Sequence, residues 1–247
     1  MKGKIAYGYV WETGNKKAVN EDSLLLRTIK TKNGSLVVGC ICDGMGGIGN
    51  GELASGYVAE QLEQWVLNEC LPAIRRGGTA VVIKGKGMRF FKKVNKELFY
   101  HMKTKRFPLG TTASVLILYE KKGYIFHIGD SRIYGFFSYL FFKGISLSRQ
   151  FTKDHRKKTN VLTRCLGLTP DGRVDFYQFQ IPKGESGFLL CSDGFYRQFD
   201  KGLKKYLAPA RLKSNAEIEK RLKEIVKRLI QKGERDNVSA LYVKVWR

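Results

Sequence analysis

The sequence lacks an apolar stretch long enough to span a bilayer. Its most apolar run, residues 133–142, is shorter than the roughly 20 residues that a membrane-spanning helix needs. The first residues also lack the apolar core and the small-residue cleavage site of a signal peptide. We therefore expect a protein that has no membrane span and stays in the cytoplasm.

Cysteine and histidine are too few and too scattered to build a disulfide or zinc framework. The five cysteines include no C-x-x-C pair, and their odd number does not suit a set of disulfides. None of the three histidines belongs to an H-x-x-x-H pair. These absences disfavour a zinc site, and we expect the cysteines to be small buried apolar residues in a reducing compartment.

Acidic residues are also few, at 22 against 45 lysines and arginines, which leaves a net charge of +23. Such a charge attracts anions, whether nucleic acid, acidic membrane or phosphorylated protein. The basic residues are dispersed, and neither an RNA-binding aromatic motif nor a zinc finger accompanies them. We favour a solvated basic surface, and we keep a nucleic-acid-binding protein as a third functional hypothesis.

The acidic residues that are present recur where apolar runs end. The run VVGCIC, residues 37–42, is typical of a strand buried on both faces, and it ends at Asp43 in the segment DGMGG. The runs YIFHIG and GFLLCS end in the same way at Asp130 and Asp193, and Asp236 precedes a final apolar run. One such Asp-Gly step alone would indicate a turn. Together these aspartates predict carboxylates gathered at one edge of a β core.

Segments with helical spacing and segments with a strand pattern follow one another without a linker or a repeat. Helices are predicted over residues 51–71, 90–102 and 216–229, with a shorter one over 161–168 and a partly looped segment over 75–87. Strands are predicted over residues 4–13, 23–26, 37–42, 111–119, 124–128, 174–181, 187–191 and 238–246, with a hairpin over 133–151. The mixture predicts one α+β domain with mostly antiparallel sheets.

Clustered carboxylates repel one another unless a cation lies among them. Oxygen ligands select hard ions such as Mg²⁺ and Mn²⁺ rather than zinc. Two such ions about 3.5–4 Å apart can share one carboxylate and support in-line attack on phosphorus. The residues alone therefore indicate divalent-metal phosphoester chemistry as a hypothesis.

The order of the short motifs is similar to that of one enzyme family. The motifs are NED at 20–22, DGMGG at 43–47, GTT at 110–112, GDSR at 129–132, SDG at 192–194 and DN at 236–237. From about residue 14 to residue 243 the chain resembles the metal-dependent protein phosphatases, which are the type 2C serine/threonine phosphatases, and Met45 resembles the bacterial branch. The resemblance implies a four-layer αββα sandwich, with two antiparallel β-sheets flanked by antiparallel helix pairs. It implies a single catalytic domain over residues 1–247.

The resemblance also implies which residues form the site. The metal ligands would be Glu21, Asp22, Asp43, the carbonyl of Gly44, Asp130, Asp193 and Asp236. Asp43, Asp193 and Asp236 would be the catalytic core around two Mn²⁺ or Mg²⁺ ions, and Asp130 would join Asp193 in a third, weaker site. A hydroxide bridging the ions would attack the phosphorus of phosphoserine or phosphothreonine. The expected partners are phosphorylated protein substrates and a cognate serine/threonine kinase, and we expect a monomer.

The chain departs from the family pattern in ways that bear on activity. Lys17 stands where relatives carry an arginine that clamps the substrate phosphate, and lysine offers a point charge rather than a two-pronged donor. The helical flap of bacterial relatives is expected to be deleted near residues 156–160, between TKDH and LTR. Met45 cannot donate a proton to the leaving group. Lys17 and the missing flap support an alternative, a catalytically weak phosphatase-like scaffold or sensor that binds phosphoproteins, whereas the full carboxylate set argues against it.

Overall fold

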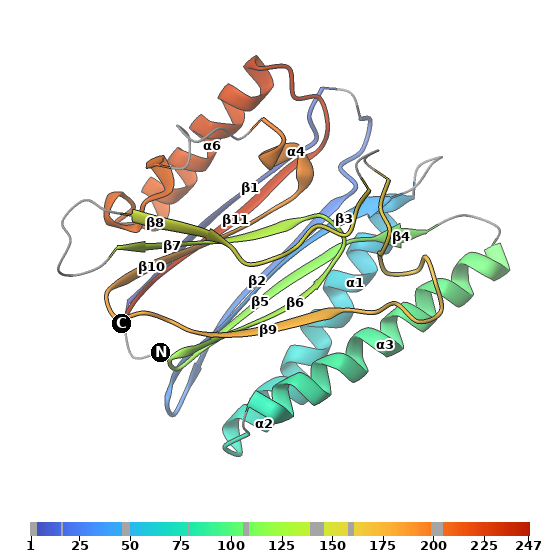
Figure 1. Ribbon diagram of the computed structural model, residues 1–247, viewed down its shortest axis with the longest axis horizontal. Coiled ribbons are helices and arrows are strands. Elements are labelled where there is room, and N and C mark those ends of the chain that lie inside the picture. The colour runs from blue at the N-terminus through green and yellow to red at the C-terminus, as the bar shows by residue number, and fades with distance from the viewer. Residues whose placement is uncertain are drawn as a thin grey trace.

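The computed structural model describes residues 4–15, 17–45, 50–78, 80–105, 109–138, 146–157, 161–198 and 205–247, with the side chains of residues 102–105, 146 and 147 left out. Its strands form two antiparallel sheets that face each other, and helices lie on both outer sides (Figure 1). Gly46 and Gly47 of the DGMGG segment lie outside the described residues, as does the tip of the predicted hairpin at 139–145.

Among the described residues, the first sheet has five strands and the second has six. In pairing order, the first sheet contains β1 (Ile5–Glu12), β11 (Val238–Trp246), β10 (Glu185–Cys191), β7 (Arg132–Ser138) and β8 (Ser146–Gln150). The second contains β2 (Asp22–Thr31), β3 (Gly34–Met45), β5 (Ala113–Tyr119), β6 (Lys122–Ile128) and β9 (Asp175–Gln180), and β4 (Gly110–Thr111) pairs with the end of β3. These strand pairings are antiparallel, which confirms the predicted sheet type.

Side chains of β3 are buried whichever face of the second sheet they point to, as the apolar run predicts. Val37 and Ile41 point between the sheets and pack with Leu190 and Leu241 of the first sheet. Their neighbours at positions 38, 40 and 42 belong instead to the apolar layer that includes helix side chains. The strand therefore needs apolar residues at successive positions rather than at alternate ones.

Helices complete the outer layers (Figure 1). On the second sheet, α1 (Gly51–Trp65) continues through the π-helical turn η1 (Val66–Cys70) into α2 (Leu71–Arg75), and α3 (Ala80–Lys105) packs beside it. On the first sheet, the described residues place one long helix, α6 (Asn215–Gln231), together with α4 (Asp193–Tyr196) and the 3-10 turns η2 (Lys205–Leu207) and η3 (Pro209–Arg211). The predicted α+β sandwich is confirmed. Within the described ranges, no helix has both the length and the hydropathy needed to cross a membrane.

Two local predictions are wrong. Residues 161–168 form no helix, because their backbone forms isolated antiparallel β-bridges with other segments. Leu162 bridges to Arg156, and Leu166 bridges to Thr111. The helix predicted from residue 90 begins ten residues earlier, because α3 starts at Ala80. The predicted partial loop within 75–87 includes residues 76–78. Gly87 serves close packing rather than a loop, because a Cβ there would lie 2.2 Å from Phe126 Cζ.

Candidate metal centre

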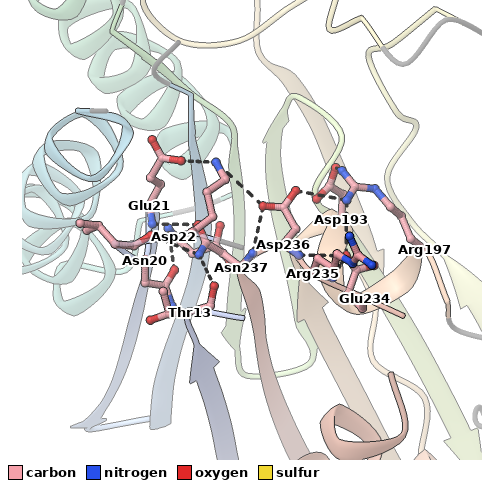
Figure 2. A network of polar contacts seen from close by, with 12 residues as sticks. Thr13, Asn20, Glu21, Asp22, Asp193, Arg197, Glu234, Arg235, Asp236 and Asn237 are labelled. Carbon is pink, nitrogen blue, oxygen red and sulfur yellow. Dashed lines mark hydrogen bonds and ion pairs between the residues drawn. The ribbon is translucent and has the colours of Figure 1, made fainter. Parts of the chain in front are cut away.

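The carboxylates of the motifs lie at one end of the sandwich. In the second sheet, Asp22 begins β2 and Asp43 lies near the end of β3, directly opposite each other in the register of the two strands. Asp193 follows β10 and Asp236 precedes β11 in the first sheet, and Asp130 follows β6. Asp22, Asp236 and Asp193 are drawn together along this edge in Figure 2. In an antiparallel pair, the start of one strand lies beside the end of its neighbour. Segments far apart in the chain therefore meet at this edge.

Asn237 joins the two sheets at this end. Its Oδ1 accepts the backbone N–H of Glu21 at 3.0 Å, and its Nδ2 donates to the carbonyl of Thr13 at 2.7 Å (Figure 2). Asn20 acts in a similar way, since its Oδ1 accepts the backbone N–H of Asp22 at 3.0 Å. The asparagines of the NED and DN motifs therefore position the backbone that carries the neighbouring carboxylates.

Thr112 and Gly44 hold the end of β3. The Thr112 side chain accepts the backbone N–H of Asp43 at 2.9 Å, and its own backbone N–H donates to the Asp43 carbonyl, also at 2.9 Å. Gly44 donates to the Glu21 carbonyl at 3.1 Å, and a Cβ on Gly44 would lie 2.1 Å from the Gly51 carbonyl oxygen. The Asp-Gly step is thus required by the close approach of two segments.

A second set of oxygens gathers beside Gly51 at the start of α1. A Cβ on Gly51 would lie 2.7 Å from Glu21 Oε1 and 2.8 Å from the Gly44 carbonyl oxygen. A carboxylate oxygen and a backbone carbonyl oxygen therefore both lie close against Gly51. Only a residue without a side chain leaves this space open.

The electrostatics of the centre are those of crowded carboxylates. Burial raises the pKa of Asp43 well above its usual range, and the charges of Asp22, Asp193, Asp130 and Asp236 raise it further. Burial also raises the pKa of Asp22 to about 7 and that of Asp193 to about 6. These side chains are close enough to resist ionising together, which is the condition that a cation relieves.

Asp22 is the clearest sign that the centre is incomplete as a purely protein structure. The residue is 1% exposed, and neither carboxylate oxygen has a hydrogen-bond partner in the described part of the chain. The hydroxyls of Ser239 and Ser192 only partly offset the effect of burial on its pKa. A buried carboxylate without a donor is costly unless a cation binds it.

Basic side chains hold the carboxylates at the rim. Lys17 pairs with Glu21 and lies 4.0 Å from Asp236 Oδ1. Arg197 pairs with Asp193 and reaches Asp236 Oδ2 at 3.2 Å (Figure 2). Arg156 lies 3.7 Å from Asp130. As the described side chains are placed, no three carboxylate, histidine or cysteine groups surround a common point closely enough to hold an ion.

The TKDH segment supports the loop that carries Asp130. Arg132 donates to both oxygens of Asp154, at 2.9 and 2.6 Å. The backbone N–H of Gly129 donates to His155 Nδ1 at 3.1 Å, and the backbone N–H of His155 donates to the Gly129 carbonyl at 2.8 Å. Burial lowers the pKa of His155, and the neutral ring then donates from Nε2 to Asp175 at 3.0 Å.

All the residues expected at the site from the motifs lie at this end of the fold, namely Lys17, Glu21, Asp22, Asp43, Gly44, Asp130, Asp193 and Asp236. Sequence reasoning missed Arg156 and Arg197. The spacing of Arg197, four residues after Asp193 at a helical start, is a signal that could have found it, because residues four apart in a helix face each other.

The profile of the protein phosphatase 2C family matches residues 14–237. The chain belongs to the protein phosphatase 2C family. This membership confirms the resemblance and the expected enzyme class, a metal-dependent serine/threonine protein phosphatase, and it does not favour the scaffold alternative. The substrates of this phosphatase are accordingly phosphoproteins.

Solved structures share the fold of this phosphatase 2C chain. PppA of Pseudomonas aeruginosa, a regulatory component of T6SS, is 21% identical, with a TM-score of 0.76 and 99% of each chain covered. Staphylococcus aureus Stp1 is 20% identical, with a TM-score of 0.78 and coverage of 100% of this chain and 96% of that one. The catalytic domain of PstP, in complex with 2 manganese ions, is 23% identical, with a TM-score of 0.74 and coverage of 98% and 99%. No curated protein matches the chain.

Proposed function

We propose that this phosphatase hydrolyses phosphoserine and phosphothreonine in proteins, with two Mn²⁺ or Mg²⁺ ions held at the carboxylate end of the sandwich. The observation that carries the proposal is the buried, unpartnered carboxylate of Asp22 opposite Asp43. The donor set consists of oxygens, which suits these hard ions. The ions would neutralise the carboxylates, activate a water and stabilise the charge of the phosphoryl group.

We assign the ligands by their surroundings. Asp43 would hold the ions from the middle of the centre, because the charges of Asp22, Asp193, Asp130 and Asp236 all act on it. Glu21, Asp22 and the Gly44 carbonyl would hold one ion near Gly51. Asp193 and Asp236 would hold the other ion. Asp130 with Asp193 would form a third, weaker site, which the pairing of Arg156 with Asp130 would weaken further.

The chain's own residues orient the substrate. Lys17, with 40% of its side chain exposed, is proposed to bind the phosphoryl oxygens from the rim of the centre. Met45 has no proton to give, so the leaving oxygen must take its proton from solvent or from water in the site. Neither role requires a covalent intermediate on the protein.

The proposed absence of a flap is supported by the chain on either side of residues 158–160, which lie outside the described residues. Lys157 donates its N–H to the Val161 carbonyl at 2.9 Å, and Thr163 donates to the His155 carbonyl at 2.8 Å. The two arms thus pair directly, which leaves little chain for a helical insertion. We propose one catalytic domain over residues 1–247 with an open, basic approach suited to a folded phosphoprotein.

We further propose that the enzyme works as a monomer in the cytoplasm and opposes a serine/threonine kinase. The net charge of +23 would draw phosphorylated substrates toward it. Opposition to a kinase is tested by asking whether this phosphatase dephosphorylates the proteins that the kinase has phosphorylated. The charge does not lead us to propose nucleic acid as a partner.

The test is hydrolysis by the purified full chain, with p-nitrophenyl phosphate and with phosphothreonine peptides, during a titration with Mn²⁺. We expect activity that rises with Mn²⁺, disappears in excess EDTA and is lost in Asp43→Asn and Asp193→Asn. Asp171→Asn is the matched control, since Asp171 is an exposed carboxylate away from the motifs. Undiminished activity in EDTA, or in both core variants, would overturn the proposal.

A further inference from the structure

Arg197 lies immediately after α4 and is surrounded by carboxylates. Its guanidinium pairs with Asp193, reaches Asp236 Oδ2 at 3.2 Å and lies 3.7 Å from Glu234 Oε1 (Figure 2). Its side chain is nevertheless 41% exposed. The carboxylates hold one part of the side chain, while another part remains open to solvent.

The three acidic partners of Arg197 do not have the same role. Asp193 and Asp236 are proposed metal ligands, whereas Glu234 is not. Glu234 is 6% exposed, and its Oε1 also accepts the backbone N–H groups of Arg235 at 2.9 Å and of Asp236 at 3.1 Å. It is therefore fixed in place by its own loop. Arg197 keeps this neighbour even when Asp193 and Asp236 have other partners.

Arg197 and Lys17 flank the same carboxylate. Lys17 Nζ lies 4.0 Å from Asp236 Oδ1, and Arg197 Nη1 lies 3.2 Å from Asp236 Oδ2. A point charge and a planar, two-pronged donor thus stand on either side of Asp236. Oxygens of a phosphoryl group accept hydrogen bonds from such a fork in the same way as carboxylate oxygens do.

We propose that Arg197 binds the phosphoryl group of the substrate together with Lys17. The inference rests on the proposed function, because ions that take the oxygens of Asp193 and Asp236 leave the N–H groups of Arg197 without those acceptors. The oxygens of an incoming phosphate then take the place of those carboxylate acceptors. Arg197 thereby supplies the two-pronged contact that Lys17 cannot make, from a different segment of the chain.

The experiment measures binding of inorganic phosphate to the full chain by calorimetry at saturating Mn²⁺, alongside the affinity for Mn²⁺ itself. Arg197→Ala is expected to weaken phosphate binding about 10- to 100-fold, as loss of charge-assisted hydrogen bonds does. Arg197→Lys is expected to recover part of the loss. Arg235→Ala, which alters an exposed arginine on the adjacent loop, leaves phosphate binding unchanged.

Kinetics with a phosphothreonine peptide provide a second readout. Arg197→Ala is expected to raise KM while kcat changes little, with a melting curve that shows the variant is folded. If Arg197→Ala is unfolded, Arg197→Gln replaces it. Unchanged phosphate affinity together with tighter Mn²⁺ binding would overturn the inference and leave Arg197 as a counter-ion of the carboxylates. Absent hydrolysis by the wild type would overturn the proposed function instead, and the phosphate titration would still decide the role of Arg197.

Discussion

Asp22 and Asp43 are direct neighbours across β2 and β3, and after burial the charge of Asp22 is the largest cause of the raised pKa of Asp43. Two adjacent strands of one sheet thus present their acids to the same small space. The fold tolerates this arrangement because a cation can neutralise it. The consequences can be measured on the protein with and without metal.

The metal-free protein should lose stability as the pH rises from about 6.5 to 8. Asp22 has a folded pKa of about 7 against an ordinary value of 3.8, so the folded state keeps this proton after the unfolded chain has lost it. The stability that results falls from about pH 4 upward, and the last part of it is lost as the pH passes through 7. His127, with a pKa of about 4, stays neutral in this window. Melting curves in EDTA should show the fall, and saturating Mn²⁺ should abolish it. A flat profile in EDTA would contradict the crowded-carboxylate description.

Asp22→Asn should stabilise the metal-free protein at pH 8 by on the order of 2 kcal/mol, because asparagine has nearly the same shape as aspartate but carries no buried charge. The same variant should bind Mn²⁺ more weakly, which calorimetry can measure. Asp171→Asn, at an exposed position, is the control and should change neither quantity. Destabilisation by Asp22→Asn in EDTA would indicate that the interaction of Asp22 with the hydroxyls of Ser239 and Ser192 outweighs the cost of burying its charge.

Asn237→Ala should destabilise the protein by about 1–3 kcal/mol, since it leaves the Glu21 N–H and the Thr13 carbonyl without a buried partner. The metal affinity should fall as well, because Asn237 positions the backbone of Glu21. Urea unfolding and Mn²⁺ calorimetry test both effects. Asn68→Ala removes an exposed amide on the π-helical turn and should cost much less.

Lys17→Arg should tighten phosphate binding by about tenfold, since it replaces a point charge with a two-pronged donor. The inhibition constant of inorganic phosphate against hydrolysis is the measurement. Lys223→Arg, at an exposed position on α6, should have no effect. No change in Lys17→Arg would mean that residue 17 faces Glu21 rather than the substrate during turnover.

Two glycines of α3 should respond in opposite directions to alanine. Gly87→Ala places a methyl group 2.2 Å from Phe126 and should destabilise by about 1–3 kcal/mol. Gly85 has space around it, with only a flexible arginine end 3.8 Å away, so Gly85→Ala should stabilise by about 0.5–1 kcal/mol through helix propensity. Equal effects of the two substitutions would contradict the packing of α3 on β6.

The predictions made from local pattern succeeded where burial and period agree. Residues 37–42 could be assigned to a doubly buried strand because a short run of successive apolar, β-branched residues is typical of a strand covered on both faces. The short helix predicted over 161–168 failed because its backbone finds partners in Thr111 and Arg156, which no local pattern reveals. Gly87 was misleading for the same reason, since its neighbour Phe126 belongs to another element.

The residues alone were enough to place aspartates at the ends of apolar runs, because strand propensity and turn chemistry act over a few neighbours. Folding decided which groups those aspartates meet. Asn237 lies 216 residues from Glu21 along the chain, and Arg197 lies 39 from Asp236, yet each pair is in contact. Contacts over such separations depend on how the two sheets pack. Only the three-dimensional structure could therefore show that Asn237 and Arg197 hold the segments of this centre together.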